Sequence, residues 1–184
     1  PKIHRLDGLV KGSTEKVPVP LHEKYSMEDM WYLDTHEARP IFEKQAKIIK
    51  AHCYKNILDA GCRHGPINKI LKSEKYTDYN YFGYDTSPEP IEIAQKEWED
   101  YPNINYACAS WNDKIDVGFT PDVIVFSGVL LYIKDDDERQ EFFEDYMFRH
   151  QCSNAIIQEP YHFQRHWDDR LILNTITNGG LDFL

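Results

Sequence analysis

A turn with two glycines, set between a short apolar run and a helical pattern, constrains the fold of this chain most. Ile57 and Leu58 form the apolar run, Asp59 ends it, and Gly61 and Gly65 lie in the turn. Because glycine has no Cβ, a strand-to-helix turn of this kind lets a bound ligand approach the backbone closely. The segment 56–67 therefore predicts a strand, a ligand-binding turn and a helix in succession.

Similar units follow along the chain. Apolar runs and helical spacing predict strands over 57–58, 79–84, 104–108, 123–126 and 155–158, and helices from Pro40 and Pro66, after the caps Ser87 and Asp135, and over 168–177. Alternating strands and helices predict an α/β fold, an open and mostly parallel sheet with flanking helices that binds ligands at the carboxyl ends of its strands. Glycines and prolines interrupt residues 1–30. We therefore expect an irregular arm or lid over 1–40 and one domain over 41–184.

Charge and cysteine usage restrict the partners and the compartment. A formal net charge of −10 over 184 residues disfavours nucleic acid, which needs a basic surface. We expect no membrane partner, because no apolar run has the length of a membrane span and the first residues do not form a signal peptide. The four cysteines have neither metal nor redox spacing, which is typical of reduced thiols in a cytoplasmic protein.

The glycine turn resembles the first motif of the class I S-adenosylmethionine-dependent methyltransferases, whose common form is Leu-Asp-x-Gly-Cys-Gly-x-Gly. Asp59, Gly61, Cys62 and Gly65 are in register with that motif, and Arg63 replaces its middle glycine. The resemblance implies a Rossmann-like fold that binds S-adenosylmethionine at these positions. Arg63 either pairs with the carboxylate of the cofactor or points to solvent.

The resemblance continues at the ends of the second and third predicted strands. Asp85 lies twenty positions after Gly65 and matches the ribose-binding acid of the family, with Thr86 beside it. A carboxylate there can accept hydrogen bonds from both ribose hydroxyls. Ser110 lies where the family usually has Asp. Ser110 and Trp111 either contact adenine or form a capped turn with a core tryptophan.

The fourth and fifth predicted strands suggest where methyl transfer would occur. By resemblance, Ser127 and Gly128 wall the methionine portion of the cofactor. Methyl transfer is an in-line displacement, which mainly requires alignment and exclusion of water. If the acceptor arrives protonated, Glu159 is the favoured general base by position and His162 is second. His162 and His166 are four residues apart but have no third fixed ligand, so we expect no metal site.

The sequence ends at Leu184, about where a sixth strand of the seven-stranded family sheet would begin. We therefore expect the last strands to be missing, leaving a sheet edge that a protein partner or a second copy could complete. The favoured function is an S-adenosylmethionine-dependent methyltransferase with an unidentified, small-molecule acceptor. The alternatives are a non-catalytic scaffold or partner-activating subunit, and a dinucleotide-dependent oxidoreductase. The fourth and fifth predicted strands fit the oxidoreductase poorly.

Overall fold

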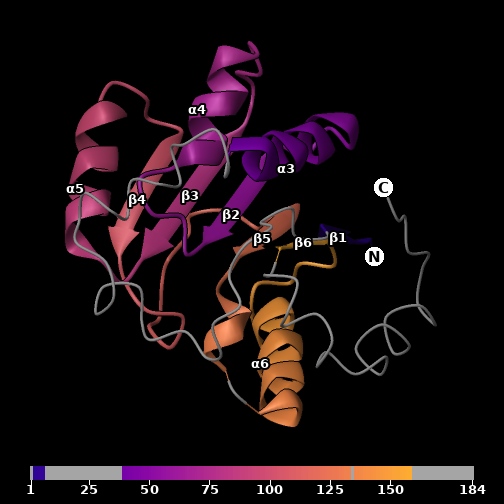
Figure 1. Ribbon diagram of the computed structural model, residues 1–184. Coiled ribbons are helices and arrows are strands. Elements are labelled where there is room, and N and C mark those ends of the chain that lie inside the picture. The colour runs from indigo at the N-terminus through magenta and orange to yellow at the C-terminus, as the bar shows by residue number, and fades with distance from the viewer. Residues whose placement is uncertain (1, 7–38, 134, 159–184) are drawn as a thin grey trace.

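The computed structural model describes residues 2–6, 39–133 and 135–158, which form one parallel six-stranded sheet with helices on both faces (Figure 1). The strand order is β1-β6-β5-β2-β3-β4. The strands are β1 (Ile3–Leu6), β2 (Asn56–Ala60), β3 (Asn80–Asp85), β4 (Ile104–Cys108), β5 (Val123–Ser127) and β6 (Ala155–Gln158). The helices are α3 (Arg39–Ala51), α4 (Pro66–Ser73), α5 (Pro88–Glu97) and α6 (Asp136–Arg149), with a 3-10 turn, η2 (Leu130–Tyr132). The predicted α/β fold is confirmed.

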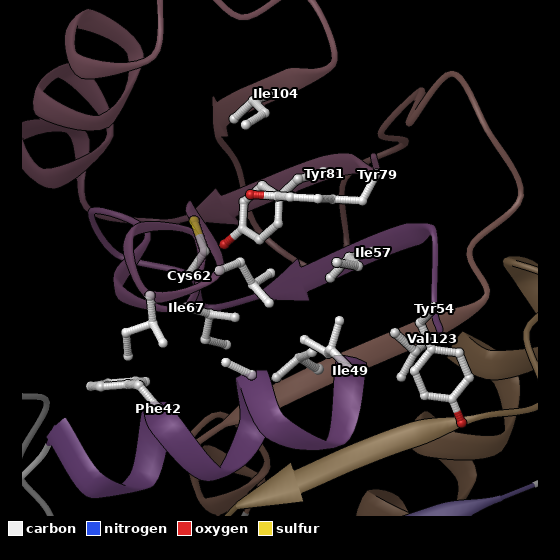
Figure 2. Packing of buried hydrophobic residues seen from close by; sticks show 14 of the residues in the cluster. Phe42, Ile49, Tyr54, Ile57, Cys62, Ile67, Tyr79, Tyr81, Ile104 and Val123 are labelled. Atoms are coloured by element: carbon white, nitrogen blue, oxygen red, sulfur yellow. The ribbon is translucent and has the colours of Figure 1, made fainter. Parts of the chain in front are cut away.

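Alternation along the strands divides the apolar side chains between two cores. Ile57 of β2 belongs to the core under α3, α4 and α5, whereas Leu58 belongs to the core under α6. Figure 2 shows Phe42 and Ile49 of α3 packed toward Ile57 and Ile67 in the first core. Burial on both faces explains why the central strands read as continuous apolar runs.

The two predicted helix caps differ in their contacts. The Asp135 carboxylate accepts the backbone N–H groups of Asp137 at 2.9 Å and Glu138 at 3.0 Å, so this cap is confirmed. Ser87 occupies the cap position of α5, but its side chain makes no cap hydrogen bond. Its backbone N–H instead donates to Asp85 Oδ1 at 2.9 Å, which directs the start of α5 toward the end of β3.

The start of the chain differs from the expected irregular arm. Residues 3–6 form β1, which pairs in parallel with β6 from Ile3 opposite Ala155 to Leu6 opposite Gln158. The run precedes the first glycine and is too short to show a period, so the sequence pattern did not identify it. Pairing satisfies the backbone groups of β6 that an open edge would expose. The edge of β6 is therefore covered. Apart from residues 2–6 and 39–40, the expected arm lies outside the described residues, as does the helix expected over 168–177.

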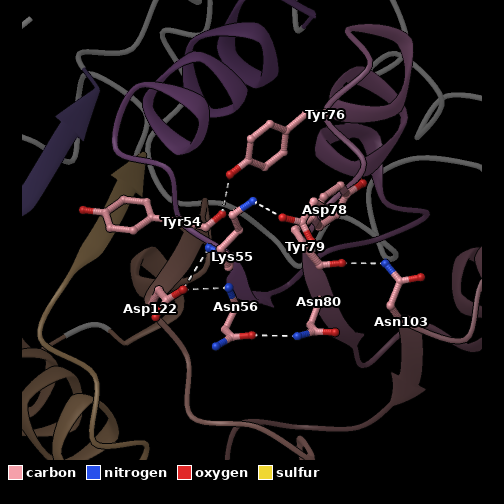
Figure 3. Close-up of polar contacts among 9 residues, drawn as sticks. All are labelled: Tyr54, Lys55, Asn56, Tyr76, Asp78, Tyr79, Asn80, Asn103 and Asp122. Carbon is pink, nitrogen blue, oxygen red and sulfur yellow. Dashed lines mark hydrogen bonds and ion pairs between the residues drawn. The ribbon is translucent and has the colours of Figure 1, made fainter.

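Polar contacts at the amino ends of the strands hold the sheet in register, opposite the edge where ligands bind such folds (Figure 3). Asp122 Oδ2 accepts the backbone N–H groups of Lys55 at 2.8 Å and Asn56 at 2.9 Å. The Asn80 amide donates to Asn56 Oδ1 at 2.8 Å. These contacts tie β2 to both of its neighbours, β5 and β3. No helix in the described part of the chain is long and apolar enough to cross a membrane.

Candidate functional site

The site lies where the order of the strands reverses. From β2 the chain continues to β3 and β4 on one side and then crosses to β5 and β6 on the other. In open α/β sheets, ligands bind in the crevice outside the carboxyl ends of the strands at such a switch point. The exits of β5, β2 and β3 are therefore adjacent, and they carry most of the residues predicted to bind a cofactor.

The turn after β2 folds back over the end of β3. The backbone N–H groups of Gly61 and Cys62 both donate to the carbonyl oxygen of Tyr84, at 2.8 and 3.0 Å. Gly61, Arg63 and Gly65 have φ values of 77°, 52° and 74°, all in the left-handed region. Arg63 therefore keeps the backbone conformation that favours glycine, at a cost of about 1 kcal/mol for its Cβ. Its side chain is partly exposed.

The glycines serve close packing within the protein. A Cβ at Gly61 would lie 2.3 Å from Val129 Cγ2, and one at Gly65 would lie 2.1 Å from the Tyr106 hydroxyl oxygen. Close approach of a ligand was the predicted reason for these glycines. Close packing against the exit of β5 and against β4 is a second reason. Gly83 in β3, where a Cβ would lie 2.6 Å from Cys62 Sγ, was not among the predicted site residues. A glycine inside a strand was the available signal.

Cys62 is buried below the turn, and its burial raises the pKa of the thiol well above its ordinary value. The thiol therefore stays protonated and acts as a small apolar group that packs against Gly83.

Asp85 is positioned by the backbone on both sides of it. Its Oδ2 accepts the N–H of Arg63 at 3.1 Å and its Oδ1 accepts the N–H of Ser87 at 2.9 Å. Each carboxylate oxygen has two acceptor sites, so each can accept one more hydrogen bond. Asp85 is partly exposed, and Thr86 beside it is exposed. The carboxylate is thus held in place with acceptor capacity left for a pair of hydroxyl groups.

Asp59 supplies a buried acceptor at the exit of β2. It is 1% exposed, and its Oδ2 accepts the Tyr81 hydroxyl at 2.6 Å. Its Oδ1 has no hydrogen-bond partner among the described residues. Burial raises the pKa of Asp59 to about 7; the Tyr81 hydrogen bond opposes this shift, and the charge of Asp85 adds to it.

A second buried acceptor comes from α3. The Gln45 amide donates to Ser127 Oγ at 2.7 Å, and Gln45 Oε1 has no partner among the described residues. Gln45 is fully buried and was not among the residues predicted for the site. The available signal was a polar residue among the apolar positions of a helix. Gly128, next to Ser127, has φ 66° and donates its N–H to the Gln158 carbonyl at 2.7 Å.

The residues after β4 form a turn and a core contact. The Ser110 backbone N–H donates to Asp113 Oδ2 at 2.7 Å, and Ser110 Oγ accepts the N–H of Asn112 at 3.4 Å. The ring of Trp111 packs against that of Phe142, with 5.4 Å between the ring centroids. These contacts agree with the capped-turn alternative, and an adenine role for either residue stays a prediction.

The predicted catalytic residues, Glu159 and His162, lie outside the described residues. Within the described ranges, no group of three histidine, cysteine or acidic side chains could hold a metal ion. The acceptors that are present suit a ligand rich in donors. The remaining capacity of Asp85 fits two ribose hydroxyls, and the unpaired Oδ1 of Asp59 fits an ammonium group. The described residues therefore fit S-adenosylmethionine.

Comparisons with known proteins agree with this geometry. The family model described as a methyltransferase domain matches residues 30–139, more than half of the chain. The comparison with curated proteins gives no match.

Solved structures of methyltransferases share the fold. The plantazolicin methyltransferase BpumL in complex with SAH is 17% identical with a TM-score of 0.55, and the match covers 75% of this chain and 56% of that one. The N-methyltransferase NodS from Bradyrhizobium japonicum WM9, in complex with S-adenosyl-L-homocysteine, is 21% identical with a TM-score of 0.54, covering 71% and 65%. The methyltransferase domain of bacterial CtHen1-C is 21% identical with a TM-score of 0.53, covering 72% and 74%.

The chain thus spans less than two thirds of the first two of these proteins. The match to the family model, together with the parallel sheet and the glycine turn at its switch point, shows that the chain belongs to the class I S-adenosylmethionine-dependent methyltransferase family.

Proposed function

We propose that this chain is an S-adenosylmethionine-dependent methyltransferase that moves a methyl group to a small-molecule acceptor. The observation that carries the proposal is Asp85, whose carboxylate is held by the N–H groups of Arg63 and Ser87 beside the glycine turn. A carboxylate fixed in this way needs no reorganisation to bind the two ribose hydroxyls. Membership of the family supports the same assignment.

The other predicted site residues take roles around this anchor. The unpaired Oδ1 of Asp59 would accept from the ammonium group of the cofactor. Ser127 and Gly128, at the exit of the neighbouring β5, would line its methionine portion. Arg63 would pair with its carboxylate. Adenine would lie against the exits of β3 and β4, near Thr86, Ser110 and Trp111. The bound cofactor supplies a methyl group on a positively charged sulfur.

The chain itself would align the acceptor and, where the acceptor carries a proton, remove it. Glu159 directly follows β6, whose last residue, Gln158, pairs with Ser127 of β5. This position supports Glu159 as the general base, with His162 as the second candidate. Replacing Glu159 by Gln should lower methyl transfer and leave cofactor affinity unchanged. A loss of cofactor affinity would instead assign Glu159 to binding.

A small-molecule acceptor agrees with the charge of the chain, because a net charge of −10 disfavours a polyanionic acceptor. The plantazolicin methyltransferase also shares this fold. A cytoplasmic location is part of the proposal, supported by four free cysteines, two of them buried. A protein partner that completes the sheet would have to pair with the outer edge of β1 or β4, because β6 is paired on both sides. Light scattering of the purified chain tests for a dimer.

The test of the cofactor site is calorimetric titration with S-adenosylmethionine and S-adenosylhomocysteine. We expect micromolar binding that falls at least about tenfold in Asp85→Ala, because two charge-assisted hydrogen bonds are lost. Asp116→Ala is the matched control, since the exposed Asp116 also accepts a backbone N–H two residues on, from Gly118 at 3.0 Å. Transfer of a labelled methyl group to a pool of small molecules then tests the activity. If neither ligand binds the wild-type chain, the proposal is wrong and the scaffold alternative gains.

A further inference from the structure

A buried arginine in the first turn of α6 contacts the segment that leaves β5. Arg139 is 3% exposed. Its Nε donates to the carbonyl oxygen of Leu130 at 3.0 Å, and its Nη2 donates to the carbonyl oxygen of Ile133. Its Nη1 pairs with the carboxylate of Asp136. One guanidinium therefore binds the carbonyl of the first residue of η2, the carbonyl just after its last residue, and a carboxylate of its own helix.

An arginine at this position contradicts the local rules for a helix. The dipole disfavours a cation in the first turn by about 0.3–1 kcal/mol. Burying the charge adds a desolvation cost, which the half-exposed Asp136 offsets in part. An apolar side chain could fill the same space without either cost. Arg139 adds directional hydrogen bonds, because its planar guanidinium points its donors at two backbone carbonyls.

The segment that Arg139 holds follows directly on the exit of β5. The Leu130 carbonyl also accepts the N–H of Ile133 at 3.1 Å, so Arg139 binds a turn that is already closed. Leu130 itself is fully buried in the core under α6. Just before it, Val129 lies against Gly61, where a Cβ would meet Val129 Cγ2 at 2.3 Å. The position of η2 therefore determines how closely the exit of β5 approaches the glycine turn after β2.

We propose that Arg139 is a positioning residue for cofactor binding: through the carbonyls of Leu130 and Ile133 it sets the spacing between the exits of β5 and β2. This inference rests on the proposed function, because that crevice is where the methionine portion of the cofactor would lie. Because Arg139 is 3% exposed, it would act through these carbonyls and not by contact with the cofactor or the acceptor. Its replacement should therefore weaken the contacts of the methionine portion and spare those of the adenosine portion, which Asp85 would bind.

The experiment compares two ligands that differ in the methionine portion. S-adenosylhomocysteine carries the amino acid, whereas methylthioadenosine has the same adenosine and sulfur without it. Arg139→Lys keeps the charge and loses the planar fork. We expect about tenfold weaker binding of S-adenosylhomocysteine and less than about twofold change for methylthioadenosine, measured by calorimetry at a temperature where thermal unfolding shows the variant to be folded. A residue that only stabilised the fold would lower the melting temperature and leave the ratio of the two affinities unchanged.

Arg39→Lys is the matched control. Arg39 is exposed at the start of α3 and pairs with Glu43 at 2.8 Å, so both affinities should stay as in the wild type. If Arg139→Lys does not fold, Asp136→Asn removes only the charge partner of the guanidinium, and the affinity for S-adenosylhomocysteine alone should fall about threefold.

An unchanged ratio of the two affinities in the folded variant would overturn the inference, even if both ligands bound more weakly. Failure of the wild-type chain to bind either ligand would instead remove the proposed function, and the inference with it.

Discussion

Replacing Asp59 by Asn should stabilise the protein, and the gain should grow as the pH rises. Asp59 is buried at the end of β2, and Tyr81 donates one hydrogen bond to it. Burial penalises the charged carboxylate and raises its pKa from 3.8 to about 7, an effect that the charge of Asp85 increases and the Tyr81 hydrogen bond opposes. Asn has nearly the same shape, can accept the same hydrogen bond and does not titrate.

The sign of the effect follows from proton binding. Between about pH 4 and pH 7 the folded chain keeps a proton on Asp59 that the unfolded chain has lost, so stability falls as pH rises through this window. Each pKa unit corresponds to about 1.4 kcal/mol. The raised pKa of Asp59, about 3 units above 3.8, therefore costs about 4 kcal/mol above pH 7 and almost nothing below pH 4. Carboxyl groups that do not interact with Asp59 titrate alike in both proteins and cancel in the difference between variant and wild type.

Urea unfolding of both proteins at several pH values from about 5 to 8 measures this difference. The free energy of unfolding of Asp59→Asn should exceed that of the wild type by a margin that widens up to about pH 7 and then levels off. Asp116→Asn, at an exposed position, should show no such trend. A margin that stays flat over the whole range would refute the reasoning, because it would mean that Asp59 does not change its charge in the folded chain.

Two further predictions concern packing and capping. Gly83→Ala should lower the free energy of unfolding by about 1–3 kcal/mol, because its Cβ would lie 2.6 Å from Cys62 Sγ and 3.0 Å from Tyr106 Cδ1. Adding Cys62→Ala should make the combined loss in urea unfolding smaller than the sum of the two, and strict additivity would contradict the proposed contact. Asp135→Ala should cost about 1 kcal/mol, because the N–H groups of Asp137 and Glu138 lose their acceptor. The check is to compare the thermal unfolding of Asp135→Ala with that of Asp137→Ala, which leaves the cap in place. Equal stability of the two variants would argue against the cap.

Local signals were enough to predict much of the fold. The five predicted strands are β2 to β6, because buried parallel strands are short apolar runs that a sequence displays directly. The cap of α6 was also predictable, since Asp135 bonds to N–H groups only two and three residues away. The glycine turn and Asp85 were found because their spacing along the chain follows the strand–turn–helix unit itself.

Features that depend on distant parts of the chain were decided by the tertiary structure. Residues 3–6 become a strand because β6, about 150 residues later, offers an unpaired edge. The buried amide of Gln45 in α3 hydrogen-bonds Ser127 at the end of β5, 82 residues later in the chain. The helix that contains Arg139 gives no reason for a buried arginine. Its hydrogen bonds to backbone carbonyls form only when α6 packs beside the exit of β5.

The sequence by itself determined which residues could form strands, helices and the cofactor turn, because those preferences arise from neighbouring residues. Only the tertiary structure decided which polar groups lose water and which partners they meet. A hydrogen bond between segments far apart in the chain leaves no periodic pattern in the sequence.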